Sequence, residues 1–244
     1  MLFRSASDDA LLHANETIRR MFAYRHDILK ALINQGLKLV VLGPDEQLAA
    51  LPEWKRASQR SPLDGTSRGP VCDPDLNLLV VAQEDVLAGA SSPRSAGSPV
   101  IAVLAEAAYR VAGLRPVIPD YRGNQQYELR VKRLDVEFDQ AVTARFEEAT
   151  AARTWAGTPA AQDKFAYWCA GVLAYFDAAG PHSAPQDSPT PVNTRERLAA
   201  YDPGLFALVH ETMAYQNRVD WRYQPPRSNQ AALTAGNPVQ PHDR

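Results

Sequence analysis

Residues 100–113 read Val-Ile-Ala-Val-Leu-Ala-Glu-Ala-Ala-Tyr-Arg-Val-Ala-Gly, and this stretch decides the fold. Its apolar run predicts a helix in which Glu106 is the residue whose side chain can take part in acid–base chemistry. Residues four apart on a helix share one face, so Ala105 and Tyr109 lie together. Glu106 and Tyr109 are three apart and are therefore neighbours. A carboxyl group in an apolar cleft has a raised pKa and can act as a general acid or base.

The sequence on either side predicts helices around a small sheet. Two short apolar runs, Leu37–Gly43 and Leu76–Ala82, are typical of buried strands. Elsewhere apolar residues recur at helical spacing. The fold class expected is therefore α+β, helix-dominated with a small sheet. The first predicted helix begins after Ser7-Asp8-Asp9. Further helices are predicted at 26–35, within 45–57, at 136–154, at 160–179, from 195–197 onward, and at 203–215. Loops are expected at 58–72, 88–99 and 115–126.

Composition narrows the classes of function. The 244 residues carry a net charge of -2, and 45% are hydrophobic, which is ordinary for a globular domain. Basic residues are scattered, so we expect no nucleic-acid partner. No apolar stretch approaches the about 18 residues of a membrane span, and the first residues show no signal-peptide pattern, so a cytoplasmic protein without a membrane partner is expected. The two cysteines, Cys72 and Cys169, are expected to be free thiols.

Several segments, in order, resemble a microbial zincin-like metallopeptidase domain family related to the catalytic domain of anthrax lethal factor. The resemblance spans about residues 5 to 223. It implies a single zincin-like domain over 1–223, and we expect 224–244 to be a disordered tail. In the family, the counterpart of 100–113 carries the zinc-binding sequence H-E-x-x-H, and a second helix supplies a glutamate ligand. The matching segments are 7–12, 25–32, 39–43, 70–79, 100–113, 166–177, 192–196, 201–203 and 220–223.

The departures from the family pattern fall on the metal site. Ala105 and Tyr109 stand at the two histidine positions, and Ala166 stands at the third ligand position. Ala170 replaces a supporting carboxylate, so only Glu106 remains. A catalytic zinc needs three protein ligands and an open position for water. The resemblance therefore implies no metal, no cofactor and no zinc peptidase activity.

The remaining site is expected to be a cleft lined by small and aromatic side chains. Glu106 and Tyr109 are its candidate catalytic pair, Glu106 for proton transfer and Tyr109 as a donor to a developing oxyanion. The alternative is a solvated Glu106 beside a Tyr109 that packs into the space of the lost metal. Cys169 is expected to be a small buried residue rather than a nucleophile. The expected pocket residues are Ala105, Ala166, Tyr167, Cys169, Ala170, Asn77 and Arg195.

Two functions fit this pattern. The first is a metal-free enzyme that binds a small apolar organic molecule and uses Glu106 in an isomerase, cyclase or lyase reaction of specialised metabolism. The second is a non-catalytic pseudopeptidase that binds a ligand or a protein partner. Replacing polar ligands by alanine enlarges and dries a pocket, which suits an apolar ligand. Retention of Glu106 favours the enzyme slightly.

Overall fold

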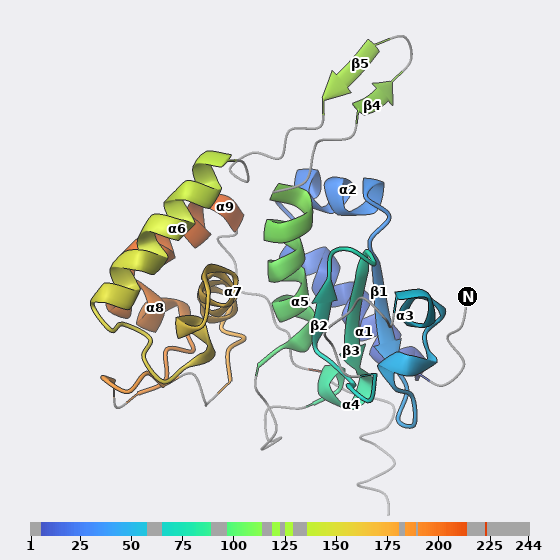
Figure 1. The fold of residues 1–244 in the computed structure, drawn as a ribbon, viewed down its shortest axis with the longest axis horizontal. Helices are drawn as coiled ribbons and strands as arrows, with labels where there is room; N and C mark the ends of the chain where they lie inside the picture. Colours follow the sequence, from blue (N-terminus) through green and yellow to red (C-terminus); the bar gives the residue numbers. More distant parts are fainter. Residues whose placement is uncertain are drawn as a thin grey trace, which may run out of the picture.

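Three strands form a mixed sheet with β3 at its centre (Figure 1). They are β1 (Lys38–Leu42), β2 (Val71–Asp73) and β3 (Leu78–Ala82), in the order β1-β3-β2. β3 runs parallel to β1 and antiparallel to β2, and Val80 lies opposite both Val40 and Val71. All five residues of β3 are buried. A strand that is covered on both faces needs an apolar residue at every position, which explains the continuous apolar run in its sequence.

This structure, a computed structural model, describes residues 6–57, 65–88, 97–113, 119–122, 125–128, 136–180, 184–188, 190–213 and 223. Helices dominate these ranges and the mixed sheet is small, so the predicted α+β class is confirmed. None of the helices within these ranges is long and apolar enough to cross a membrane. The tail expected at 224–244 lies outside the described residues.

Helices of the first half of the chain pack around the sheet. They are α1 (Asp8–Met21), α2 (His26–Asn34), the short α4 (Gln83–Val86) and α5 (Pro99–Ala107). The Ser7 side chain caps α1 by accepting from the Ala10 amide, and acidic residues follow in the first turn, where they complement the helix dipole. These features confirm the predicted first helix. Two small elements, η1 (Leu48–Ala50) and α3 (Pro52–Ala57), occupy the segment where one or two short helices were predicted.

Helices of the second half of the chain gather around α7 (Lys164–Tyr175). They are α6 (Val136–Ala151), α8 (Arg195–Tyr201) and α9 (Pro203–Met213), with the 3₁₀ turn η3 (Pro159–Ala161) in front of α7. α7 starts later than predicted, because Asp163 caps it by accepting from the Phe165 and Ala166 amides at 2.8 Å. A proline-led 3₁₀ turn therefore replaces the first turn of the predicted helix.

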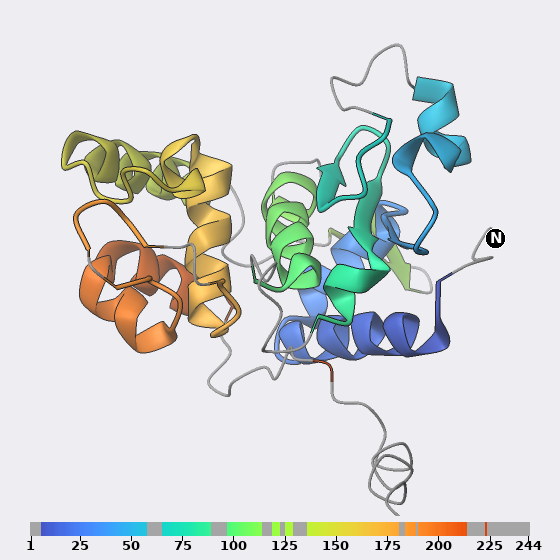
Figure 2. The ribbon, with the colours of Figure 1, turned by 90° about the horizontal axis from the view of Figure 1, so that it is seen from below.

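α5 joins the two halves. It contacts β2 and β3 on one side and α7 on the other, and Figure 2 shows it standing between the sheet and the second group of helices. The Ser98 side chain caps it by accepting from the Ile101 amide, and seven of its nine residues are buried. A π-helix, η2 (Ala108–Gly113), continues it. The quoted stretch 100–113 is therefore the central helix of the fold.

Two predicted loops are wrong in part, because they contain strands. β2 lies at the end of the segment predicted as the loop 58–72. A hairpin of β4 (Pro119–Arg122) and β5 (Gln125–Glu128) occupies the segment predicted as the loop 115–126. The two strands pair antiparallel, with Arg122 opposite Gln125 and Pro119 opposite Glu128.

Gly171 allows α7 and α9 to approach closely. A Cβ atom at this position would lie 2.7 Å from Cγ of Leu205, well inside van der Waals contact. We expect Gly171→Ala to lower the free energy of unfolding by about 1–3 kcal/mol, measured by urea denaturation. Helix propensity alone predicts the opposite sign, a gain of about 1 kcal/mol, so increased stability would contradict the packing argument. Leu205→Ala should cost less in the G171A background than alone, because it relieves the clash.

Candidate functional site

A pocket of about 380 Å³ lies where α5 and α7 face each other. From the α5 side it is lined by Ala102, Val103, Glu106 and Arg110, and from α7 by Ala166, Cys169, Ala170 and Leu173. The residues 102, 106 and 110 are four apart, so they share one face of the helix. Alanines at facing positions leave the space between the two helices unfilled. The segment between α6 and α7, residues 155–163, completes the wall.

Glu106 is the acidic group that α5 brings to this pocket. Its side chain is 27% exposed, and one carboxylate oxygen lies 3.0 Å from Nε of Arg110. Burial raises the pKa of Glu106, the positive charge of Arg110 lowers it, and the nearby Asp163 carboxylate raises it again. The net result is a pKa above the ordinary value. The protonated form therefore persists to higher pH than in water, which suits a group that exchanges a proton with a ligand.

Arg110 is held against the pocket wall by an aromatic ring. The central carbon of its guanidinium group lies 4.0 Å from the centroid of the Phe165 ring, a cation–π distance. Both residues line the pocket. Arg110 belongs to the π-helical turn η2, and such turns occur frequently at functional sites. The sequence reasoning missed Arg110, although its position four residues after Glu106 was the available signal.

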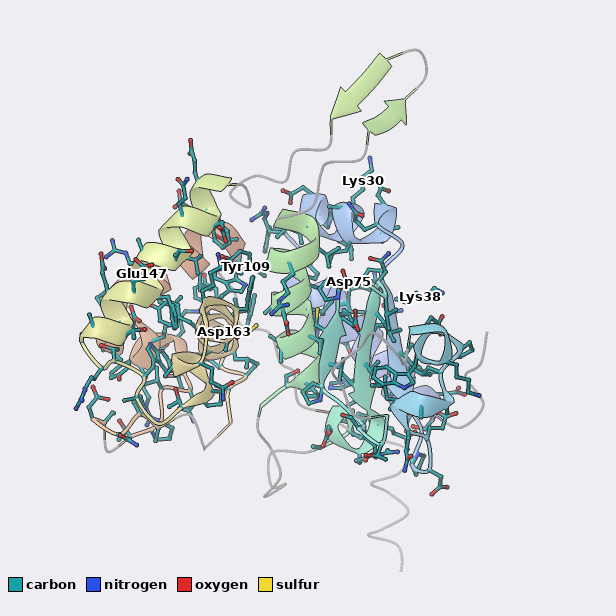
Figure 3. All side chains as sticks on the ribbon, in the orientation of Figure 1. Lys30, Lys38, Asp75, Tyr109, Glu147 and Asp163 are labelled. Carbon is teal, nitrogen blue, oxygen red and sulfur yellow. The ribbon has the colours of Figure 1, made fainter. Side chains whose placement is uncertain are left out.

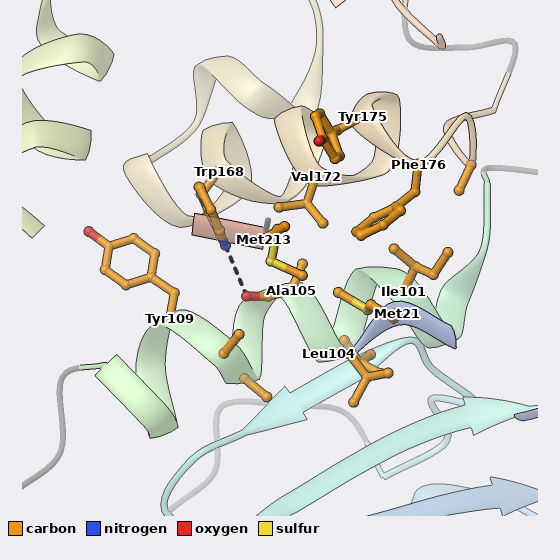
Figure 4. Close-up of a cluster of buried hydrophobic side chains, with 14 of the residues drawn as sticks. Met21, Ile101, Leu104, Ala105, Tyr109, Trp168, Val172, Tyr175, Phe176 and Met213 are labelled. Atoms are coloured by element: carbon orange, nitrogen blue, oxygen red, sulfur yellow. Dashed lines mark hydrogen bonds between the residues drawn. The ribbon is translucent and has the colours of Figure 1, made fainter. Parts of the chain in front are cut away.

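Tyr109 lies in the core and does not line the pocket. It is fully buried, and its hydroxyl donates to Asp139 at 2.5 Å. Figure 4 shows its ring beside Trp168 and away from the end of α5 that carries Ile101. Ala105 and Tyr109 share a face turned toward α7, one position around the helix from the face that carries Glu106. The structure therefore does not bring Tyr109 into the same cleft as Glu106, which differs from the expected pairing of the two residues.

The Tyr109 hydroxyl belongs to an ionic cluster with Asp139 of α6 and Lys164 of α7, and Figure 3 labels Tyr109 close to α7. Asp139 also accepts from Lys164 Nζ at 2.6 Å. Burial of Tyr109 and its bond to Asp139 raise the pKa of the phenol far above its ordinary value. For Asp139, burial favours the neutral form, but hydrogen bonds from Lys164 and Tyr109 outweigh it and lower the pKa. Tyr109 is thus a structural donor, in agreement with the alternative of a tyrosine packed in the core.

Ala105 and Tyr167, two of the expected pocket residues, also belong to the core. The Ala105 carbonyl accepts from Nε1 of Trp168 at 3.0 Å (Figure 4). The Tyr167 hydroxyl donates to Asp202 at 2.7 Å. Neither residue lines the pocket. With Ala105 beneath Trp168 and the Tyr109 hydroxyl bound to Asp139, positions 105 and 109 offer no donor set that fits zinc.

Asn77 and Arg195 lie away from the pocket. Asn77 closes the turn between β2 and β3 with φ of 51°, a left-handed conformation that asparagine adopts more readily than most residues. Arg195 begins α8; its Nε donates to the Tyr175 carbonyl at 2.9 Å, and its guanidinium covers the Tyr175 ring at 4.0 Å. Both residues therefore have local structural roles.

Cys169 lines the pocket, between Ala166 and Ala170 along α7. Its Sγ lies 3.8 Å from the Ala102 carbonyl, and neither Cys72 nor Cys169 forms a disulfide bond in the described part of the chain. Burial, aided by the Glu106 charge, raises the pKa of the Cys169 thiol well above its ordinary value. The thiol is therefore neutral and a poor nucleophile, and the residue is half-buried in the pocket wall rather than fully buried as expected.

Of the expected site residues, the structure brings together Glu106, Ala166, Cys169 and Ala170. Comparison with protein-family models, with curated proteins and with solved structures found no match. Across the described part of the chain, no group of three or more His, Cys, Asp or Glu side chains is arranged to hold a metal ion. The arrangement offers a mainly apolar cavity in which the half-buried Glu106 carboxyl group lies beside the guanidinium group of Arg110.

Proposed function

We propose that this chain is a degenerate zincin-like protein without peptidase activity, whose pocket between α5 and α7 binds a small apolar organic molecule. The family assignment rests on the ordered segments that resemble zincin-like domains. The binding proposal rests on a pocket of about 380 Å³ whose wall is mainly apolar and includes five alanines. Cavities of about 300–1,000 Å³ with few polar groups are typical of small-molecule sites.

The observation that carries a catalytic function is the Glu106 carboxyl group in this apolar wall. Burial raises its pKa above the ordinary value, and a carboxyl group in a largely apolar pocket can act as a general acid or base towards a bound molecule. Isomerisation, cyclisation and elimination all proceed by such transfers and need no further reagent. We therefore favour a metal-independent isomerase, cyclase or lyase that uses Glu106 as acid and base.

A non-catalytic binding protein is the alternative, and the Glu106–Arg110 ion pair favours it. An ion pair 3.0 Å long lowers the basicity of the carboxylate and gives it a structural use. In that case the pocket would hold a ligand or a protein segment without converting it. The two functions share the same pocket and differ in whether Glu106 exchanges a proton with the bound molecule.

Filling the pocket tests the binding proposal. We expect naphthalene to bind the unaltered protein and Ala170→Phe to weaken its binding at least about tenfold, because the new ring occupies the cavity. The measurement is a fluorescence titration at equilibrium. Ala207→Phe is the matched control, since Ala207 is exposed on α9, and it should leave the affinity unchanged. No binding to the unaltered protein, or equal weakening by both variants, would contradict the proposal.

A further inference from the structure

Arg110 is the one cationic side chain among the described residues that line the pocket. It lies on the same helical face as Glu106, one turn further along, and stacks on Phe165 at 4.0 Å. Stacking on a ring fixes the plane of a guanidinium group and excludes water from one of its faces. The cation is therefore held in place before any ligand arrives.

The Arg110–Glu106 pair leaves donors for a ligand. A guanidinium group carries five N–H donors. Nε of Arg110 is 3.0 Å from the Glu106 carboxylate, yet it is buried and makes no hydrogen bond within the described structure. The two groups thus attract each other without saturating the donors. Because Nε is buried, a ligand oxygen placed beside Glu106 would meet the N–H groups of the two terminal guanidinium nitrogens instead.

Charge balance indicates the kind of oxygen that fits. Glu106, Asp163 and Arg110 together give the pocket lining a charge of about -1 when both carboxylates are ionised, so a carboxylate ligand would add a second negative charge. A neutral carbonyl compound adds none. If Glu106 takes a proton from the ligand, the negative charge moves from the carboxylate to the ligand oxygen, and the total charge of the pocket is unchanged.

We propose that the pocket takes an apolar ketone with an acidic C–H beside its carbonyl, that Glu106 removes this proton, and that Arg110 binds the resulting enolate oxygen. This inference rests on the proposed function and names its substrate class. The Cα–H bond breaks, its proton goes to the Glu106 carboxylate, and its electron pair forms the C=C bond of the enolate. The carbonyl π pair moves to oxygen beside Arg110. Return of the proton to the same carbon regenerates the ketone. In a ketone with a neighbouring C=C bond, return of the proton to the conjugated carbon shifts the double bond and completes an isomerisation without any co-reactant.

Two bound molecules separate this inference from the proposed function. Naphthalene tests the apolar pocket, and 2-naphthol adds one oxygen on a planar, enol-like ring. We expect 2-naphthol to bind about 10- to 100-fold more tightly than naphthalene, the gain of a hydrogen bond to a charged group. Arg110→Met should remove this gain, measured in the variant as the ratio of 2-naphthol to naphthalene affinity, so that any change in apolar binding is common to both molecules. Arg110→Lys, which keeps the positive charge, should restore part of it.

The titrations are repeated in the E106Q background, because Arg110→Met also removes the charge that lowers the pKa of Glu106. The reaction itself is followed by NMR as exchange of the α-protons of 2-tetralone in D₂O. Exchange should fall by about 10²-fold in the Arg110→Met variant and by at least as much in the Glu106→Gln variant.

The outcomes are distinct. Naphthalene binding without an oxygen-dependent gain, or a gain that survives Arg110→Met, overturns the inference and leaves the apolar pocket standing. Failure of naphthalene to bind overturns the proposed function and the inference with it. Tight 2-naphthol binding without any exchange of 2-tetralone overturns the proton removal by Glu106. Circular dichroism melting of each variant identifies a loss of fold as the cause of any lost binding.

Discussion

Replacing Glu106 by glutamine is expected to lower turnover of the substrate by about 10²- to 10⁴-fold, the range for loss of a positioned general acid or base. The amide has nearly the same shape as the carboxyl group but cannot exchange a proton. Ligand affinity should change far less, because the apolar wall of the pocket is untouched. The measurements are the initial rate and the equilibrium affinity of the same molecule. Glu147→Gln is the matched control, since Glu147 is exposed on α6 (Figure 3).

The same substitution has a pH-dependent effect on stability. Burial is the first cause of the raised pKa of Glu106, so the folded state favours its protonated form. The stability that this group contributes is fully present below its unfolded pKa and is lost as pH rises through the folded pKa. The glutamine variant lacks this loss, although it also lacks the ion pair with Arg110. Urea denaturation at several pH values should therefore show a smaller decline with rising pH in the variant.

Unchanged turnover in the glutamine variant would contradict the catalytic role of Glu106. If the unaltered protein binds the ligand and forms no product, the non-catalytic alternative is favoured instead. A fall in both rate and affinity accompanied by a lower melting temperature would point to a structural role for the ion pair.

Asp202→Ala is expected to destabilise the fold more than any other single change considered for this chain. One Asp202 oxygen accepts from Nε1 of Trp155 at 3.0 Å and from the Tyr167 hydroxyl at 2.7 Å. The other accepts from the Leu205 amide at 2.9 Å in the first turn of α9. Trp155 and Tyr167 are each only 1% exposed, so their donors would find no water after the change. Each unsatisfied buried donor costs about 1–3 kcal/mol.

The lost cap at α9 adds about 0.5–2 kcal/mol. Together with the two unsatisfied donors, the expected loss is about 2.5–8 kcal/mol of the free energy of unfolding. Urea denaturation measures it. Asp187→Ala is the matched control, because Asp187 accepts from the Tyr201 hydroxyl at 2.8 Å at an exposed site. That change should cost about 1 kcal/mol or less. Equal losses in the two variants would show that Asp202 does not hold the buried donors.

Much of the fold follows from local signals in the sequence. α1 and α2 are marked by capping residues and apolar spacing, and β1 and β3 by uninterrupted apolar runs. β2 has three residues, too few for a repeating pattern. In the sequence, a Gly-Asn pair separates the residues of β4 from those of β5, and this pair is the sequence signal for a hairpin. The residues around the pair lack the apolar alternation of a half-buried strand, so the two strands are not predicted.

The sequence predicts those parts of the candidate site whose placement depends only on residue spacing within one helix. Spacing along α7 places Ala166 and Ala170 on one face, and spacing along α5 places Glu106 on the facing side. The direction of Tyr109 depends instead on Asp139, thirty residues further along the chain, which helical spacing does not reveal. Tyr167 is likewise drawn into the core by Asp202, which is 35 residues away. Hydrogen-bond partners that are distant in the sequence therefore determine whether such a tyrosine lies in the core or lines the pocket.

The place of α5 between the sheet and the second helical group has a thermodynamic consequence. A molecule in the pocket contacts α5 on one side and α7 on the other, so separating the two halves of the chain would require its release. Ligand binding and cohesion of the halves are then linked equilibria. At a ligand concentration of about 100 times Kd, such linkage adds about 2.7 kcal/mol to the stability of the folded state. The small molecule would in this way act as part of the core that joins the two halves.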